Sequence, residues 1–79
     1  MDVTQRVSRI IAEIFDLPIE DITLRSGPEN IAGWDSFGQM NLVVAIESEF
    51  NCVLEFEEIF RIVDAETLVQ LVIEKIDAS

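Results

Sequence analysis

Residues 34–50 read WDSFGQMNLVVAIESEF, and this stretch decides the fold because it holds both the start of a helix and the apolar residues that bury it. The pattern predicts a helix from Ser36 to about Phe50. Ser36 and Gln39 have the spacing of a capping box, in which a serine oxygen accepts a hydrogen bond from a free amide three residues on. Asp35 fits the N-cap equally well, so the sequence leaves the capping residue open between the two.

The same helix carries two apolar stripes on nearly opposite faces, given about 100° of rotation per residue. The first stripe consists of Leu42, Val43, Ile46 and Phe50, and the second consists of Phe37, Met40 and Val44. One stripe is enough to face the core of a small helical domain. The second stripe is therefore either covered by a connecting segment or left available to another protein.

The flanking segments predict three more helices. Apolar residues at helical spacing predict a first helix from about Val3, which Leu17-Pro18 ends because proline disfavours helical geometry in the residue before it. A short third helix is predicted over residues 57–63. Thr67 and Gln70 have the capping-box spacing for the start of a last helix, whose buried stripe is the apolar set Leu68, Leu71, Val72 and Ile76.

A long connection separates the first two helices and includes the turn Ser26-Gly27-Pro28. Loops of this length are unusual in small domains unless they are anchored or functional. The expected anchors are Ile19, Ile22, Leu24 and Ile31. We expect an all-α fold: a small four-helix bundle with a long first loop and a short third helix, forming a single domain over residues 1–79.

Chain length and hydropathy limit the class of protein. A chain of 79 residues buries only about 60% of its unfolded surface and cannot support a second core. Its longest apolar run, residues 42–46, is far short of the roughly 18 residues of a membrane span. The first ten residues lack the hydrophobic core of a signal peptide. We expect a monomeric cytoplasmic protein without a membrane span.

The charge is strongly acidic, with sixteen Asp and Glu against five Lys and Arg and a net charge of −11. Nucleic acid is excluded as a partner, because phosphate contacts need clustered basic residues. Residues 26–60 contain no basic residue, so one side of the molecule should carry a negative field. This field either attracts basic surfaces of partner proteins or serves solubility, and charge alone leaves both open.

Groups suited to catalysis are scarce. The chain has no His and no Tyr, so the usual bases that activate a nucleophile are missing. The single Cys52 excludes an internal disulfide and a metal site, and we expect it to be a small apolar filler after the helix. Glycine-rich phosphate loops and calcium loops are absent from the sequence. We therefore expect a protein that is not an enzyme, with any covalent chemistry at Ser36 performed by another protein.

One pattern remains, and it consists of Trp34-Asp35-Ser36-Phe37, Met40, Leu42-Val43, Ile46-Glu47 and Phe50. It resembles the acyl carrier protein family and its peptidyl and aryl carrier relatives, and helix order and acidity agree along the whole chain. The resemblance implies that Ser36 carries 4′-phosphopantetheine, transferred from coenzyme A by a separate magnesium-dependent phosphopantetheinyl transferase. The thiol of this arm would present acyl intermediates as thioesters to enzymes of fatty-acid, polyketide or related biosynthesis.

The resemblance also implies roles for the neighbours of Ser36. Asp35 would be the acidic residue that the transferase recognises, and a helix N-terminus at Ser36 would favour the phosphodiester anion. The residues that would contact partner enzymes are Phe37, Met40, Val44, Glu47, Glu57 and Glu58. Such partners would be acyl-transferring, ligase or synthase enzymes with basic docking surfaces. The carrier itself would bind no metal.

Several positions depart from the common family pattern. Phe37 stands where leucine is usual, and uncharged residues occupy a helix that is often more acidic, at Gly38, Gln39, Asn41 and Ser48. These departures favour a specialised carrier over the general fatty-acid carrier, while Asp35 favours an acyl over a peptidyl carrier. Trp34 is common in stand-alone carriers, and it also suits a ring that seals the end of the bundle. The alternative function is a non-covalent acidic adaptor that docks partner proteins without a prosthetic group.

Overall fold

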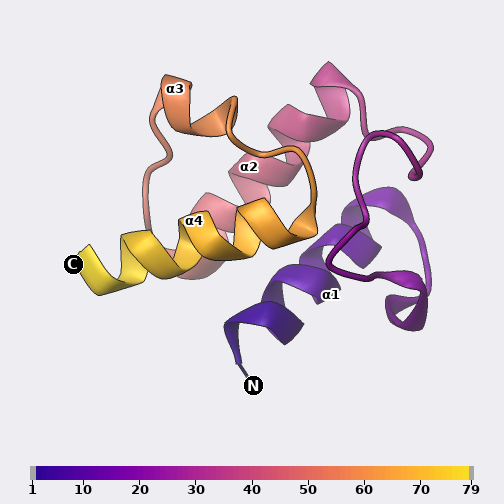
Figure 1. The fold of residues 1–79 in the computed structure, drawn as a ribbon, viewed down its shortest axis with the longest axis horizontal. Coiled ribbons are helices and arrows are strands. Elements are labelled where there is room, and N and C mark those ends of the chain that lie inside the picture. The colour runs from indigo at the N-terminus through magenta and orange to yellow at the C-terminus, as the bar shows by residue number, and fades with distance from the viewer. Residues whose placement is uncertain (1, 79) are drawn as a thin grey trace.

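The computed structural model describes residues 2–78, and these form helices joined by loops (Figure 1). In chain order the elements are α1 (Val3–Phe15), the 3-10 helix η1 (Ile19–Asp21), α2 (Ser36–Phe50), α3 (Phe56–Ile59) and α4 (Ala65–Ala78). Helix α1 packs against both α2 and α4. The described chain contains four α-helices and no strand, which confirms the predicted all-α bundle with a long first loop and a short third helix.

The core lies between α1, α2 and α4. Its fully buried side chains are Val7, Ile11, Leu42, Ile46, Leu68, Leu71 and Val72. Burial of each such side chain stabilises the fold by roughly 1.5–3 kcal/mol. The first predicted stripe of α2 faces this core, with Phe50 partly buried at its end. Ile76 of α4, predicted as buried, is 39% exposed.

Helix boundaries follow local capping. Helix α1 ends at Phe15, just before Leu17-Pro18 as predicted, and its C-cap Asp16 adopts the left-handed conformation with φ of 55°. Helix α3 covers Phe56–Ile59, which is shorter than the predicted 57–63, and its capping box is formed by Glu55 and Glu58. No helix of residues 2–78 has the length and apolar character needed to cross a bilayer.

Helix α4 begins two residues before Thr67, so the predicted capping box of Thr67 with Gln70 is wrong. Asp64 caps the helix instead: its Oδ1 accepts from the Thr67 amide at 2.8 Å, and the Thr67 hydroxyl accepts from the Asp64 amide at 3.1 Å. The reciprocal pair satisfies two amide donors, because both members of a capping box bond to each other's backbone. Helix α4 therefore starts directly after Asp64 rather than at Thr67, where the sequence pattern placed its cap.

The long first loop is anchored mainly by its backbone. Ser26 is buried, and its carbonyl accepts from the Ala65 amide at 2.8 Å, while the Leu24 carbonyl accepts from the Glu66 amide at 3.0 Å. These are first-turn amides of α4 that have no partner within their own helix. Of the predicted apolar anchors, Ile31 is buried and Ile22 packs against the core. The other two, Ile19 and Leu24, are 42% and 44% exposed and anchor little.

Candidate functional site

The site begins at the N-terminus of α2, where Asp35 is the N-cap. Its Oδ1 accepts from the Gly38 amide at 2.9 Å, and its carbonyl accepts from the Gln39 amide at 2.7 Å. Ser36 is therefore the first helical residue, and the predicted capping box of Ser36 with Gln39 does not form. Of the two capping residues that the sequence left open, the structure selects Asp35, because a carboxylate accepts from the helix amides more strongly than a hydroxyl does.

Ser36 is exposed at this helix end and fits the attachment of an anionic group. Within the described residues, the amides of Ser36 and Phe37 are the first-turn donors that no protein acceptor satisfies. Together with the partial positive charge of the helix N-terminus, they favour a phosphate ester at the Ser36 hydroxyl. The observed exposure of the hydroxyl leaves it accessible to another protein.

The loop that leads into α2 is pressed against the helix. Trp34 is 2% exposed and stacks on Phe15, with ring centroids 5.2 Å apart and ring planes 14° apart. A Cβ atom on Gly38 would lie 2.2 Å from the carbonyl oxygen of Gly33, whose φ is +90°, and 2.9 Å from Phe15. Only glycine fits at position 38 without displacing the loop, since carbon and oxygen atoms this close repel strongly. This packing fixes where Ser36 stands.

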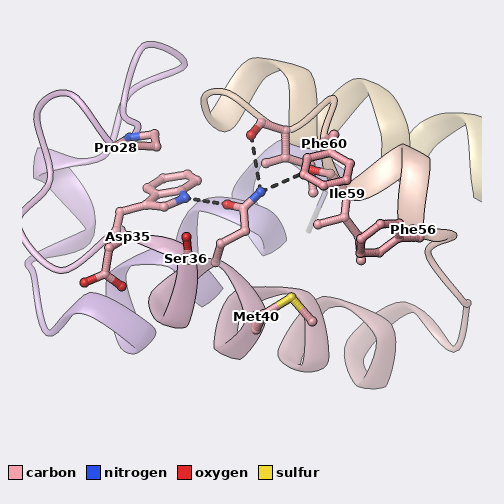
Figure 2. A pocket seen from close by; sticks show the side chains of 10 residues that line it. Pro28, Asp35, Ser36, Met40, Phe56, Ile59 and Phe60 are labelled. Carbon is pink, nitrogen blue, oxygen red and sulfur yellow. Dashed lines mark hydrogen bonds between the residues drawn. The ribbon is translucent and has the colours of Figure 1, made fainter.

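An apolar groove opens beside Ser36, between α2 and the chain around α3 (Figure 2). It has a volume of about 440 Å³ and is lined by Pro28, Trp34, Asp35, Ser36, Gln39, Met40, Phe56, Ile59, Phe60 and Ile62. Its two buried lining residues, Trp34 and Ile62, form the floor and belong to the core. In Figure 2 the hydroxyl of Ser36 points toward this groove, so a group attached there can enter it.

Gln39 joins the two sides of the groove, a role that the sequence analysis missed. Its Oε1 accepts from Trp34 Nε1 at 2.6 Å, and its Nε2 donates to the carbonyls of Ile59 at 3.2 Å and Ile62 at 3.3 Å (dashed lines in Figure 2). The sequence offers a weak signal for this role. Gln39 stands one turn after the cap and five residues after Trp34, and its carboxamide can both donate and accept hydrogen bonds.

The second apolar stripe of α2 is exposed rather than covered by the long loop. Phe37, Met40 and Val44 are 78%, 49% and 62% exposed. Phe56 and Phe60, which are 73% and 71% exposed, extend this apolar surface across α3, with their rings in edge-to-face contact at 4.9 Å. These two phenylalanines were not among the site residues predicted from the sequence. Exposed apolar patches rimmed by polar residues mark interaction surfaces.

The three predicted acidic contact residues do not form one free cluster. Glu47 accepts from the Leu54 amide at 2.8 Å, and Glu58 accepts from the Glu55 amide at 2.7 Å and from Lys75 at 2.6 Å. The hydrogen bond from Lys75 lowers the pKa of the Glu58 carboxyl below its usual value. Glu57 is exposed and has no bonded partner among the described residues. Glu47 and Glu58 therefore bond within the fold, and only Glu57 is available to a partner.

Cys52 offers no competing reactive group. It is a free thiol, partly buried against the core, as the filler interpretation expects. Burial, and then the nearby Glu47 carboxylate, raise the pKa of this thiol, which disfavours the reactive thiolate. In the part of the chain that the structure covers, no three acidic, cysteine or histidine side chains are grouped to hold a metal ion.

Comparison with known proteins identifies the family. Residues 5–72 match the family described as phosphopantetheine attachment site. The chain is 30% identical to the acyl carrier protein of Cyanidium caldarium over 96% of its own length and 88% of that protein. It is also 30% identical to the acyl carrier protein of Petrotoga mobilis, over 92% of its own length and 86% of that protein.

Structural similarity agrees with this assignment. The solution NMR structure of holo acyl carrier protein from Geobacter metallireducens superimposes with a TM-score of 0.86 at 24% identity, covering 99% of this chain and 90% of that one. At this identity the likeness shows a shared fold. Together with the sequence matches, it leads to one conclusion. The chain belongs to the acyl carrier protein family, whose members carry covalently attached 4′-phosphopantetheine and are carriers rather than enzymes.

Proposed function

We propose that Ser36 is the residue that carries 4′-phosphopantetheine, and that residues 1–79 act as a single carrier domain. The observation that carries the proposal is the position of Ser36: an exposed hydroxyl in the first turn of α2 that points toward an apolar groove. When bound, the group supplies a terminal thiol on which acyl intermediates are held as thioesters. The other described serines lack this combination, since Ser8 lies within α1, Ser26 is buried and Ser48 lies near the end of α2.

The residues around Ser36 prepare it for modification by another protein. Asp35 accepts from the Gly38 amide, which leaves the amides of Ser36 and Phe37 free for a phosphodiester. The carboxylate of Asp35 remains exposed at the surface, where a phosphopantetheinyl transferase can recognise it. The chain has no His to act as a base, and it needs none if the transferase activates the serine.

Apolar contact dominates the proposed docking surface. On α2, Glu47 is bonded to the Leu54 amide and Glu49 is paired with Arg6 at 2.9 Å, so neither acid is free for a partner. The exposed stripe of Phe37, Met40 and Val44 is accordingly the main feature that α2 presents. Partners would bring an apolar centre and a basic rim that faces Glu57. Buried apolar anchors of this kind contribute most of the binding energy at interfaces.

These features favour a specialised carrier that serves a dedicated ligase or a polyketide-like pathway over the general carrier of fatty-acid synthesis. The resemblance implies that this helix is often more acidic in the family, whereas α2 here has only two glutamates, Glu47 and Glu49, and both are bonded within the protein. Its place of action would be the cytoplasm, where coenzyme A and the transferase are available, and we expect it to act as a monomer.

The alternative remains a non-covalent adaptor, which the exposed stripe of α2 would also serve. One measurement distinguishes the carrier from the adaptor. The protein is incubated with coenzyme A, magnesium and a broad-specificity phosphopantetheinyl transferase, and its intact mass is determined. A gain of one phosphopantetheine that disappears in Ser36→Ala and persists in the control Ser48→Ala supports the carrier. If a known carrier is modified under the same conditions and this chain is not, the adaptor is favoured.

A further inference from the structure

Gln39 holds together the two walls of the groove beside Ser36. We call residues 55–63, which form the outer wall, the α3 segment. The carboxamide of Gln39 donates to the carbonyls of Ile59 and Ile62 in this segment and accepts from the indole of Trp34 at the floor of the groove. Across residues 2–78, these are the only hydrogen bonds that join α2 directly to the α3 segment.

The far side of the α3 segment is held by α4. Lys75 pairs with Glu58 at 2.6 Å, and Arg61 pairs with Glu74 at 3.0 Å. On the groove side, Ile62 is buried in the core and Ile59 packs against it, whereas the rings of Phe56 and Phe60 are largely exposed. The carboxamide of Gln39 therefore adds to this apolar contact the direct polar link between α2 and the outer wall of the groove.

The bridge also lies between Ser36 and the core. The floor of the groove is formed by Trp34 and Ile62, which are 2% and 4% exposed, and Gln39 is bonded to the side chain of the first and the backbone of the second. A chain attached at Ser36 that moved inward between α2 and the α3 segment would have to break these bonds. Breaking them would leave a partly buried indole N–H and the Ile62 carbonyl without partners, which is unfavourable, whereas the Ile59 carbonyl would still accept from the Ile62 amide at 3.1 Å.

We propose that Gln39 is a positioning residue: it keeps the α3 segment closed on α2, so that the group tethered at Ser36 stays in the surface groove and enters the bundle only when this bridge opens. The proposal rests on the proposed function, since it assumes a group at Ser36. Its first test uses the unmodified protein and is therefore independent of that assumption.

The first test compares three variants by hydrogen exchange and by the resonance of the indole N–H. Gln39→Met keeps the side-chain length and removes all three bonds, while Gln70→Met makes the same change at an exposed position of α4 as a control. We expect amide exchange at residues 59–62 to accelerate about tenfold in Gln39→Met, because the hydrogen bonds that link this segment to α2 are lost. Trp34 is the single tryptophan, and its indole resonance should shift as it loses its acceptor.

Gln39→Glu separates positioning from simple loss of stability. An ionised glutamate can still accept from Trp34 but cannot donate to the carbonyls of Ile59 and Ile62. We expect exchange at residues 59–62 to accelerate in this variant while the indole resonance stays close to that of the wild type. If exchange at residues 59–62 matches the Gln70→Met control, the proposal is overturned. Should Gln39→Met fail to fold, Gln39→Glu decides alone.

The second test follows the tethered group itself. The wild type and Gln39→Met are loaded from octanoyl-coenzyme A by the transferase, and methyl resonances are compared with those of the unloaded proteins. In the wild type, the shifts should change at Met40 in the groove and stay constant at the buried Ile46 and Leu68. In Gln39→Met they should change at the buried methyls as well. Equal changes at the buried methyls of both proteins contradict the proposal. A wild type that cannot be loaded refutes the proposed function and leaves the exchange result standing.

Discussion

Gly38→Ala should destabilise this protein, although glycine to alanine in a helix interior normally stabilises by about 1 kcal/mol. The new Cβ would lie 2.2 Å from the Gly33 carbonyl oxygen and 2.9 Å from Phe15. To relieve this overlap, the backbone at Gly33 must move about 1 Å away from α2, and this movement disturbs the stacking of Trp34 on Phe15. Overpacking costs roughly 1–3 kcal/mol, and a 2.2 Å clash with a backbone oxygen belongs in the upper part of that range. After the gain of about 1 kcal/mol from alanine is subtracted, the net loss should be about 1–2 kcal/mol.

The assay is urea unfolding followed by circular dichroism, with thermal melting as a second measure. A loss of this size lowers the Tm of a domain this small by about 5–15 °C. The matched control is Ser48→Ala at an exposed position of the same helix, which should be neutral or slightly stabilising. Modification of Ser36 by the transferase should also slow in Gly38→Ala, since the loop positions that serine. A Gly38→Ala protein as stable as the wild type would show that the loop and helix are not in the contact described.

Three further predictions concern the surface. Met40→Glu should change the free energy of unfolding by less than about 1 kcal/mol, because Met40 is half exposed. It should weaken acyl transfer to partner enzymes about tenfold or more, and loss of helix in circular dichroism would instead place Met40 in the core. The Tm should rise as salt increases from about 0.01 M to 0.5 M, since screening reduces repulsion at a net charge of −11; a Tm indifferent to salt would argue against this. In the wild type, the hydrogen bond from Lys75 lowers the pKa of the Glu58 carboxyl, and Glu58→Gln removes the negative charge from this pair. The stability that this carboxylate contributes is present above the ordinary Glu pKa of about 4.3 and is lost as pH falls through its lowered pKa. The difference in unfolding free energy between wild type and Glu58→Gln should therefore shrink below about pH 4, and a difference independent of pH would contradict the pairing.

Sequence patterns predicted correctly those features of the fold that depend on residues close together in the chain. The helix from Ser36 to Phe50 and its two stripes were predicted correctly, because periodicity is a local property. The capping residue was left open and proved to be Asp35. The contribution of Gln39 was missed because its acceptors, the carbonyls of Ile59 and Ile62, lie 20 and 23 residues away. No local pattern encodes such a distant contact.

The predicted acidic contact residues show a second limit of prediction from the sequence. Glu47 and Glu58 read as surface charges in the sequence, yet each accepts a backbone amide, at Leu54 and Glu55 respectively. Carboxylates near chain reversals often serve as backbone acceptors, and composition does not distinguish this use from a docking charge. The start of α4 was also predicted too late in the chain, because the Asp64 carboxylate accepts from the Thr67 amide and caps the helix three residues before Thr67.

The most direct test of the central claim is the location of the attached group. After reaction with coenzyme A and the transferase, the protein is digested and its fragments are sequenced by mass spectrometry. We predict that the added mass lies on Ser36 and on no other serine. Modification of a different residue, such as the exposed Ser48, would contradict the account even if the intact mass had increased.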